Sequence, residues 1–395
     1  MTFFYKDAYG ILTRNKKGFT VKTALRDALT LIISHVTPLK ILDSVPLMKA
    51  RGRICAQNID AVRAIPPFDI SLRDGRFIPL DKQGISLLHV KDLPLISTGE
   101  KVPEHCALII ESEELLQETI TLTKQWQNLP SKEHIKCKGE DIQKGERLLK
   151  TGDRIGPFDI TNLASQGVAH VPVLKEARIA YVGIGDELID VQEQANDHMT
   201  YNSNAYTMAA RGEMMGARTA IITHVKDTRK EIIKKLRSLK KYDAIITSGG
   251  MSTGDAMHQL LEDGTLTPLF KGVAMAPAGL TALSFLEETP ILHLPGLPMA
   301  CLLGFEVIGA ALIRQLYGIK EIEGSIMTNT AQTIKYNPRS QSIVPGFFDG
   351  HLFFPERIAA GMLNVLNRCN GFILPTQDHP LEVGDPVVFH PFVSW

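Results

Sequence analysis

The sequence has little of what marks a nucleic-acid-binding, secreted or membrane-spanning protein. Lys plus Arg and Asp plus Glu each number 43 among the 395 residues, so the formal net charge is zero. Binding to nucleic acid or to an anionic membrane would therefore need a local basic patch. No apolar run approaches the ~20 residues that span a bilayer, and the N-terminus lacks the pattern of a signal peptide. These absences predict a cytoplasmic protein that binds small molecules and other proteins, and neither nucleic acid nor membrane.

The sequence also lacks closely spaced cysteine pairs and a recognisable catalytic nucleophile motif. None of the cysteines shows the short paired spacing of a zinc or redox site. There are five: Cys55, Cys106, Cys137, Cys301 and Cys369. The 12 histidines are dispersed, and no Ser–His–Asp arrangement is recognisable. The pattern favours reduced core cysteines and gives no sign of a catalytic triad.

What is present is the composition of a globular protein. Hydrophobic residues make up 44% and charged residues 22% of the sequence, which is enough nonpolar surface for several cores. A chain of this length exceeds what one hydrophobic core usually supports, so we expect about two to four domains.

Patterns along the chain predict four domains. Apolar residues recur at helical spacing over 21–34, and Pro38 closes this helix. Residues 54–136 mix short β-branched runs with proline and glycine, as in a small β domain. A short helix at 160–166 is grouped with the first helix. The expected domains are 21–50 with 141–176 (helical, discontinuous), 51–140 (small β), 177–320 (α/β) and 324–395 (C-terminal β barrel).

Strand-like and helical runs alternate through the α/β segment. In chain order they are 178–182, 204–215, 217–225, 228–239, 243–247, 291–294 and 300–316. Such alternation calls for a mostly parallel sheet with helices on both faces. The predicted fold class is multidomain α/β plus β, with a central three-layer α/β domain, a small β domain and a C-terminal β barrel.

Three loops of this sheet are candidates for ligand binding, because ligands bind where parallel strands deliver their carboxyl ends into loops. Residues 183–187, 247–255 and 294–298 are expected to converge on one edge. Gly249 and Gly250 allow the backbone to approach a phosphate closely, and N–H groups at the start of the next helix face an anion. An isolated glycine pair is more often a tight turn, but three such loops on one edge favour a phosphate site.

Carboxylates stand near the same edge. Glu187 and Asp227 follow the first and second strands, and Asp141 lies in a turn just outside the sheet. Clustered carboxylates beside a phosphate site indicate a hard divalent cation. For Asp227 the alternative is a cap of the helix at 228–239.

Taken together, these segments resemble the molybdopterin molybdenumtransferase family, known as MoeA in bacteria and as the E domain of gephyrin in animals. Each similar segment is short, but the series keeps the family's order over most of the chain and is highly specific. The segments are 66–75, 98–104, 139–145, 185–188, 202–204, 248–255, 272–277, 294–298, 361–363 and 370–375.

The resemblance implies an enzyme of molybdenum cofactor biosynthesis that inserts molybdenum from molybdate into adenylylated molybdopterin, with Mg²⁺ or another divalent cation, and releases AMP. It implies a homodimer in which each site lies between the α/β domain of one subunit and the β domain of the other. By position, the expected catalytic residues are Asp74 (from the partner subunit), Asp141, Glu187 and Asp227, of which the last two would hold the metal. The expected substrate-binding residues are Thr98, Gly249, Gly250, Ser252, Asp255, Pro295, Gly296 and Pro298.

Several positions depart from the family pattern. Where the family has a lysine on each side of a Pro-Gly pair, this sequence has Ala276 and Gly279. A polar amide is replaced by Leu297. Other departures are Ile70, Leu72, Arg73 and Arg76 beside Asp74, Ile358-Ala359-Ala360, Gly183-Ile184, and an aspartate missing near Met257. Loss of two cations predicts impaired oxyanion handling. Lys271, Arg73 and Arg76 are candidates for relocated positive charge, against the alternative of ordinary surface residues.

Three functional hypotheses follow. The first is the transferase reaction, with other cofactor-assembly proteins as further partners. The alternative is a catalytically impaired pterin-binding or scaffold paralogue of the same fold. A third is a nucleotide-processing hydrolase that uses the same cleft. Molybdate-dependent release of AMP distinguishes the first from the other two.

Overall fold

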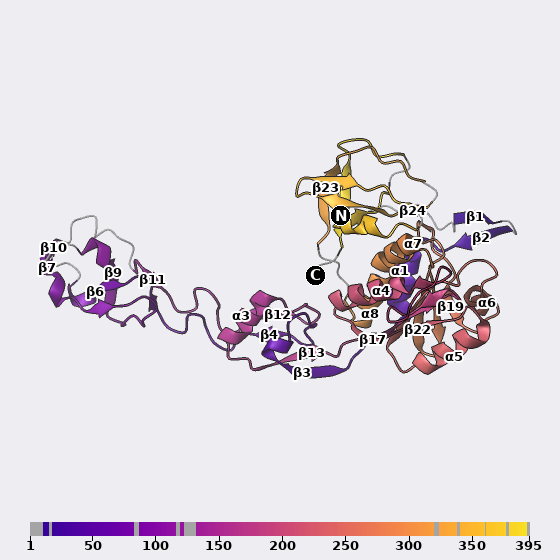
Figure 1. The fold of residues 1–395 in the computed structure, drawn as a ribbon. Coiled ribbons are helices and arrows are strands. Elements are labelled where there is room, and N and C mark those ends of the chain that lie inside the picture. The colour runs from indigo at the N-terminus through magenta and orange to yellow at the C-terminus, as the bar shows by residue number, and fades with distance from the viewer. Residues whose placement is uncertain are drawn as a thin grey trace. The chain divides into compact units, whose positions relative to one another are not determined.

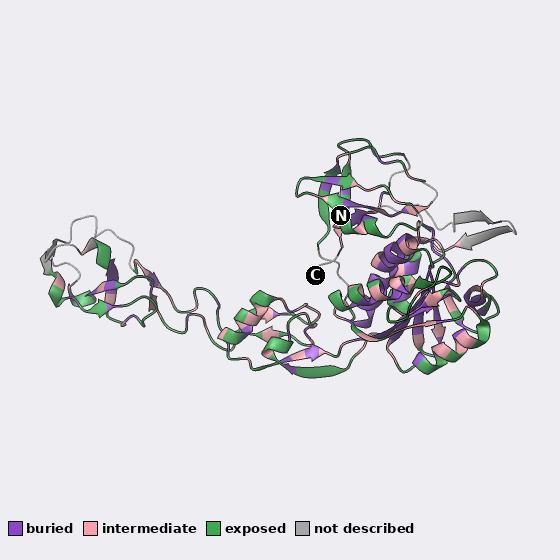
Figure 2. Ribbon diagram, viewed as in Figure 1, coloured by how far each residue is buried: buried purple, intermediate pink, exposed green. Residues whose placement is uncertain are grey.

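A computed structural model describes residues 11–15, 18–82, 87–115, 119–121, 132–319, 324–337, 340–359, 361–376 and 379–392. The chain divides into two compact units (Figure 1). Unit 1 comprises Met1–Leu42 and Leu174–Trp395, and unit 2 comprises Asp43–Val173. Buried residues are concentrated in the α/β part of unit 1 (Figure 2).

A six-stranded sheet forms the centre of unit 1. Its order is β17 (Arg218–Val225), β14 (Arg178–Ile184), β18 (Ala244–Ser248), β22 (Thr289–Leu294), β21 (Ala282–Leu286) and β19 (Thr267–Phe270). The first four strands are parallel, and the last two are added antiparallel. Nearly every residue of β14 and β18 is buried, as expected of central parallel strands covered on both faces. The predicted mostly parallel sheet is confirmed, with an antiparallel edge that the sequence did not predict.

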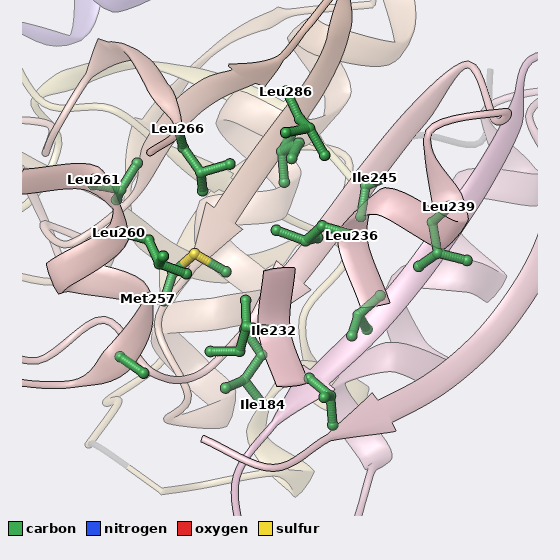
Figure 3. Packing of buried hydrophobic residues seen from close by; sticks show 14 of the residues in the cluster. Ile184, Ile232, Leu236, Leu239, Ile245, Met257, Leu260, Leu261, Leu266 and Leu286 are labelled. Atoms are coloured by element: carbon green, nitrogen blue, oxygen red, sulfur yellow. The ribbon is translucent and has the colours of Figure 1, made fainter. Parts of the chain in front are cut away.

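One face of the sheet is covered by α5 (Arg229–Leu239) and α6 (Ala256–Glu262). Ile232 and Leu236 of α5 and Leu260 of α6 belong to the same buried cluster as alternate residues of β14, including Val182 and Ile184 (Figure 3). Because successive strand residues point to opposite faces, the residues between them face the other layer.

That other layer contains α4 (Ser203–Met214) and a helical stretch built from α7 (Pro298–Gly304), a π-helical turn η5 (Phe305–Gly309) and α8 (Ala310–Leu316). A side chain at Gly212 of α4 would lie 2.1 Å from the hydroxyl of Tyr181 in β14, so the helix packs closely on the strand. The three-layer arrangement is confirmed.

The stretch Pro298–Leu316 corrects one sequence-based statement. Its 19 residues are long and apolar enough to cross a membrane, although no such run was expected. However, 78% of its most apolar window is buried inside the structure, and Glu306 forms an ion pair with Arg211 of α4 at 2.7 Å. The stretch is thus accounted for as a core helix.

The first helix, α1 (Leu25–His35), belongs to unit 1. Gln315 of α8 donates its side-chain amide to the carbonyls of Ile33 (3.1 Å) and Val36 (2.7 Å). The other predicted helix, α3 (Pro157–Ser165), lies in unit 2. The two helices that the sequence grouped in one domain thus lie in different compact units, and carbonyls at the end of α1 accept hydrogen bonds from α8.

Before α1, a hairpin of β1 (Ile11–Asn15) and β2 (Gly18–Lys22) leads into Thr23, which bridges to Val273. Unit 1 also contains two short parallel strand pairs: β15 (Leu188–Ile189) with β16 (Thr200–Tyr201), and β20 (Met275–Ala276) with β24 (Gln341–Ser342).

The C-terminal barrel is closed by β23 (Ile326–Thr330), β26 (Leu352–Pro355), β25 (Val344–Phe348), β27 (Gly371–Ile373) and β28 (Pro386–Pro391). The turn η6 (Asn364–Arg368) precedes β27. Phe353 and Phe389 fill its centre with ring centroids 5.8 Å apart. Added side chains at Gly346 and Gly371 would come within 2.5 Å and 2.4 Å of these two rings, so the large and small residues interlock. The predicted barrel is confirmed.

Unit 2 is built from short strands, as predicted for a small β domain. Its pairs are β3 (Leu42–Pro46) with β13 (His170–Leu174), β4 (Ile59–Asp60) with β12 (Arg147–Leu149), β5 (Ile70–Ser71) with β11 (Ile135–Lys136), and β7 (Leu87–His89) with β10 (Thr119–Thr121). β6 (Gly75–Pro79) lies between β8 (Leu95–Ile96) and β9 (Cys106–Glu111). Four single turns complete it: η1 (Leu47–Lys49), η2 (Leu80–Lys82), η3 (Val90–Asp92) and η4 (Ser112–Glu114).

Candidate functional site

The three predicted loops of unit 1 do come together at the carboxyl edge of the parallel strands. Gly249, directly after β18, donates its N–H to the carbonyl of Leu294 at 3.0 Å. Gly185, directly after β14, donates to Val225 at the end of β17 at 3.1 Å. A side chain on Gly296 would lie 3.3 Å from the Cα atom of Gly249. The loop after β18 therefore packs against the loop after β22.

The two adjacent glycines are required by this packing. Gly249 has φ of +99°, and a Cβ there would lie 2.2 Å from the carbonyl oxygen of Ile184. Gly250 has φ of +65°, and its Cβ would meet Ile184 at 3.0 Å and the carboxylate of Asp227 at 3.2 Å. The space beside Gly249 is thus filled by the neighbouring strand rather than left for a ligand, and its part in a phosphate site stays a prediction.

A hollow of about 120 Å³ opens at this edge. It brings three predicted site residues, Glu187, Gly296 and Pro298, next to Ser248 and the start of α4. Because α4 begins at Ser203, the free N–H groups of its first turn lie at the hollow and favour an anion there.

Asn204 is a site residue that the motif argument did not single out. Its side-chain amide donates to the carbonyl of Gly296 at 2.8 Å, which ties α4 to the third loop. Its side-chain oxygen is buried without a hydrogen-bond partner in the described part of the chain, so it can accept from a ligand. Its position in the Asn202-Ser203-Asn204 sequence, directly before a helical pattern, was the available signal.

An acidic group lies beside the hollow. Burial raises the pKa of Asp227 above its ordinary value, and the charge of Asp255 raises it further, while an N–H donated by Ala256 opposes both. Smaller contributions in the same direction come from Asp186 and Glu187. The carboxylates after β14, β17 and β18 are therefore close enough to repel one another.

Asp227 is not the cap of α5. Thr228 fills that position, with its hydroxyl accepting from the N–H of Glu231 at 3.4 Å. Asp227 instead accepts from Ala256 at the start of α6 at 3.3 Å, and Asp255 accepts from the N–H of Ser252 at 2.8 Å. One oxygen of Asp227 remains without a protein donor among the contacts described.

The carboxylates do not form a closed metal-binding set. Among the described residues, no group of three His, Cys, Asp or Glu side chains is arranged to hold a metal ion. Mg²⁺ commonly takes only one or two protein carboxylates, with water and substrate oxygens completing its shell. The assignment of Glu187 and Asp227 to such an open site stays a prediction, and a divalent cation there would relieve their mutual repulsion.

The other three predicted residues belong to unit 2. Asp74 accepts the N–H of Thr98 at 2.7 Å, so these two predicted site residues lie together. Asp141 is exposed and forms an ion pair with Lys136 at 3.7 Å. Neither contact by itself distinguishes a site residue from a surface turn.

All three candidates for relocated positive charge are engaged elsewhere. Lys271 pairs with Glu262 at 3.3 Å, and Arg73 pairs with Glu111 at 3.0 Å. The guanidinium of Arg76 donates to the carbonyl of Leu93. These contacts support the alternative that they are ordinary structural or surface residues.

A larger cavity, of about 660 Å³, lies between the α/β domain and the barrel within unit 1. Four positions that depart from the family pattern line it together: Ala276, Leu297, Ile358 and Ala359. The remaining wall mixes apolar residues with Lys335, Arg357 and Glu356, of which Glu356 is paired with Arg368 at 3.2 Å. All four residues are uncharged, so these positions offer a ligand in the cavity no charge.

Two family models match the chain in order. The MoeA N-terminal region (domain I and II) matches residues 23–167, and a probable molybdopterin binding domain matches residues 180–315. The molybdopterin molybdenumtransferase of Staphylococcus aureus (strain COL) is 29% identical over 348 residues, which are 81% of this chain and 82% of that protein. A protein of the same name from Staphylococcus epidermidis (strain ATCC 35984) is 26% identical over 336 residues, or 78% and 79% of the two chains.

Solved structures show the same fold. A MoeA protein of molybdopterin biosynthesis from Pyrococcus horikoshii superimposes with a TM-score of 0.78 at 19% identity, covering 93% of this chain and 99% of that one. A second structure of such a protein gives a TM-score of 0.75 at 21% identity, with coverages of 95% and 100%. At these identities the likeness concerns the fold alone.

Proposed function

The chain belongs to the MoeA family, as a divergent member, and we propose that it acts in molybdenum cofactor biosynthesis by inserting molybdenum from molybdate into adenylylated molybdopterin, with release of AMP. The observation that supports this most is the joint match of both family regions, in order, to a chain whose strand-end loops converge as described. We propose further that the protein is a cytoplasmic homodimer.

Within this function, the hollow at the strand ends is the site for the phosphate part of the pterin substrate. The first turn of α4 offers N–H donors, and the loop from Ser248 through Ser252 would lie alongside the ligand. The unsatisfied oxygen of Asn204 can accept a hydrogen bond from the substrate. Thr98, Asp255 and Pro295 remain proposed substrate contacts.

Glu187 and Asp227 are the proposed ligands of the divalent cation, with Mg²⁺ as the first candidate. A bound cation would neutralise the carboxylates and supply Lewis-acid orientation of substrate oxygens. The raised pKa of Asp227 supports this assignment, because burial and neighbouring negative charge both oppose its ionised form. Asp74 and Asp141 are proposed to complete the catalytic set.

The test is release of AMP from adenylylated molybdopterin with molybdate present or omitted, and with Mg²⁺ or EDTA. We expect release that needs both molybdate and the cation. AMP release that ignores molybdate would support a nucleotide-processing hydrolase. Tight pterin binding without any AMP release would support an impaired pterin-binding paralogue, which the apolar wall at Ala276 and Leu297 makes the second candidate.

A further inference from the structure

The side chain of Lys22 lies in a trough made by two glycines of the 272–280 loop. A Cβ on Gly272 would be 3.6 Å from Cγ of Lys22, and a Cβ on Gly279 would be 2.5 Å from its Nζ atom. The stem of the lysine therefore crosses Gly272, and its ammonium occupies the space where a side chain of residue 279 would begin.

This ammonium is half-buried and has no carboxylate partner among the described side chains. Burial lowers the pKa of Lys22 from its ordinary value. No ion pair with Lys22 is found among the side chains that the structure describes, whereas Lys271, one residue before the loop, is paired with Glu262. An ammonium has three donors, and desolvating it without a counter-charge is unfavourable, so the position favours an anion.

Backbone hydrogen bonds fix the position of the lysine relative to the loop. Thr23 donates to the carbonyl of Gly272 at 3.0 Å and accepts from Ala274 at 2.8 Å. On its other side, the loop receives the N–H of Ile343 at the carbonyl of Ala276, also at 2.8 Å. The backbone at Lys22 is thus tied to the loop through the adjacent residue Thr23, which limits how far the ammonium can move away from it.

The loop that holds Lys22 also borders the large cavity. Ala276 and Pro277 line that cavity, three and two residues before Gly279. Neither Ala276 nor Gly279 brings a charge of its own. A cation beside a partly desolvated loop acts over several ångströms, because screening by water is weaker there than at an open surface.

We propose that Lys22 binds a tetrahedral oxyanion at the 272–280 loop, supplying from the N-terminal hairpin the positive charge that the loop itself lacks. The identification of this oxyanion as molybdate rests on the proposed function. Lys22 is on this account a substrate-binding residue, and the N-terminal hairpin is part of the site's construction.

The first experiment measures protection of Lys22 in the full-length protein. Amine labelling with trinitrobenzenesulfonate, followed by peptide mass spectrometry, gives the modification rate at Lys22 and Lys271 with increasing molybdate. We expect saturable slowing of labelling, at least about threefold at Lys22, and no change at Lys271. Equal rates with and without molybdate at Lys22 would overturn the proposal, and this result requires no variant to fold.

The second experiment exchanges the position of the charge. Lys22→Met should weaken molybdate binding, measured by calorimetry without pterin, by about tenfold or more, while Lys271→Met stays within about twofold. Gly279→Lys alone should crowd the Lys22 ammonium and not strengthen binding. The double variant Lys22→Met with Gly279→Lys should recover most of the lost affinity.

The outcomes separate this inference from the proposed function. If Lys22→Met folds with a lowered melting temperature but unchanged molybdate affinity, Lys22 is only structural and the inference fails. If molybdate protects Lys22 but no AMP is released, the inference stands and the proposed reaction fails. If AMP release is normal in both the native protein and Lys22→Met, the reaction stands and the inference fails.

Discussion

Gly249 and Gly254 have nearly the same φ angle in different surroundings. Their φ angles are +99° and +100°, but a Cβ on Gly249 would meet the carbonyl of Ile184 at 2.2 Å, while nothing lies within 4 Å of one on Gly254. Both substitutions to alanine incur the cost of a left-handed conformation, about 1 kcal/mol. Only Gly249→Ala also has to displace the end of β14 at Ile184.

We therefore expect Gly254→Ala to lower the free energy of unfolding by about 1 kcal/mol and Gly249→Ala by about 3 kcal/mol or more. Urea unfolding followed by helical circular dichroism measures both. Equal losses would mean that Gly249 is not packed against the end of β14 as described.

The charge of Asp227 is predicted to oppose stability while serving function. Its pKa is raised, first by burial and then by Asp255, so the folded state holds the proton more tightly than the unfolded state. The ionised carboxylate therefore destabilises the fold at pH values above its pKa, and this penalty disappears as the pH falls through it. Asp227→Asn should raise the melting temperature slightly at neutral pH and lower AMP release at least about tenfold.

Asp263 provides the control of opposite sign. Hydrogen bonds from Thr265 and from Arg229 lower the pKa of Asp263 to about 2, so its charge favours the folded state. Asp263→Asn should lower the melting temperature at neutral pH and leave AMP release unchanged. If Asp227→Asn behaves in the same way as Asp263→Asn, the assignment of Asp227 to the site is wrong.

At the scale of residues, the sequence could predict carboxylates but not the location of the compensating cation. Glu187 and Asp227 stand directly after strands, so the edge of a parallel sheet brings them together. Lys22 is remote in sequence from Gly279, and only the bridge between Thr23 and Val273 places it there. The candidates close to the loop and to Asp74 in sequence, such as Lys271 and Arg73, proved to have carboxylate partners of their own.

At the scale of elements, long periodic segments were predictable and short ones were not. The patterns at 178–182, 228–239 and 300–316 correspond to β14, α5 and the α7–α8 stretch. By contrast, β19 contains Pro268 and spans only Thr267–Phe270, and its pairing with β21 depends on the rest of the sheet. The contact of α1 with the α/β domain could not be read from the sequence, because its apolar face fits any core and its partner, Gln315, lies 282 residues after Ile33 in the sequence.

β22 is joined to its neighbours by a buried histidine that gives the sheet a pH dependence. His293 lies between the hydroxyls of Thr247 in β18 (3.0 Å) and Ser284 in β21 (2.8 Å). Burial lowers its pKa to about 3, so it stays neutral in the folded state while it binds a proton in the unfolded state below about pH 6.5. Stability is therefore lost as the pH falls below the unfolded value.

The expected loss is about 1.4 kcal/mol per pH unit from about pH 6.5 downward. His293→Gln is less stable at pH 8 but should lack this slope, so the difference between the two proteins shrinks as the pH falls towards 5. Urea unfolding at a series of pH values measures the difference. A constant difference would show that His293 is charged, or solvated, in the folded protein.

At the scale of the whole molecule, the proposed homodimer makes a prediction about complementation. Sedimentation at micromolar concentration should give twice the 43.6 kDa of one chain. If Asp74 of one subunit serves the Asp227 of the other, Asp74→Asn and Asp227→Asn should each lower AMP release at least about tenfold when tested alone. Mixed dimers of the two would contain one fully native site, so random exchange should restore about a quarter of the native activity.

Two outcomes decide this prediction. A single 43.6 kDa species would exclude the dimer. A dimer without restored activity after subunit exchange would mean that both residues act in the same site of one subunit, or that Asp74 has no part in it. The matched control is the double variant Asp74→Asn with Asp227→Asn mixed with native protein. After subunit exchange, this mixture should show no more AMP release than the native protein in it supplies.

The trough that holds Lys22 also couples two positions that are far apart in the sequence, Lys22 and Gly279. With Lys22 present, any side chain introduced at position 279 would begin 2.5 Å from the ammonium. A side chain at residue 279 and the Lys22 ammonium therefore compete for the same space, and a larger residue there would displace the end of the lysine side chain. The effect of a substitution at position 22 should thus depend on which residue stands at position 279, and the reverse holds as well.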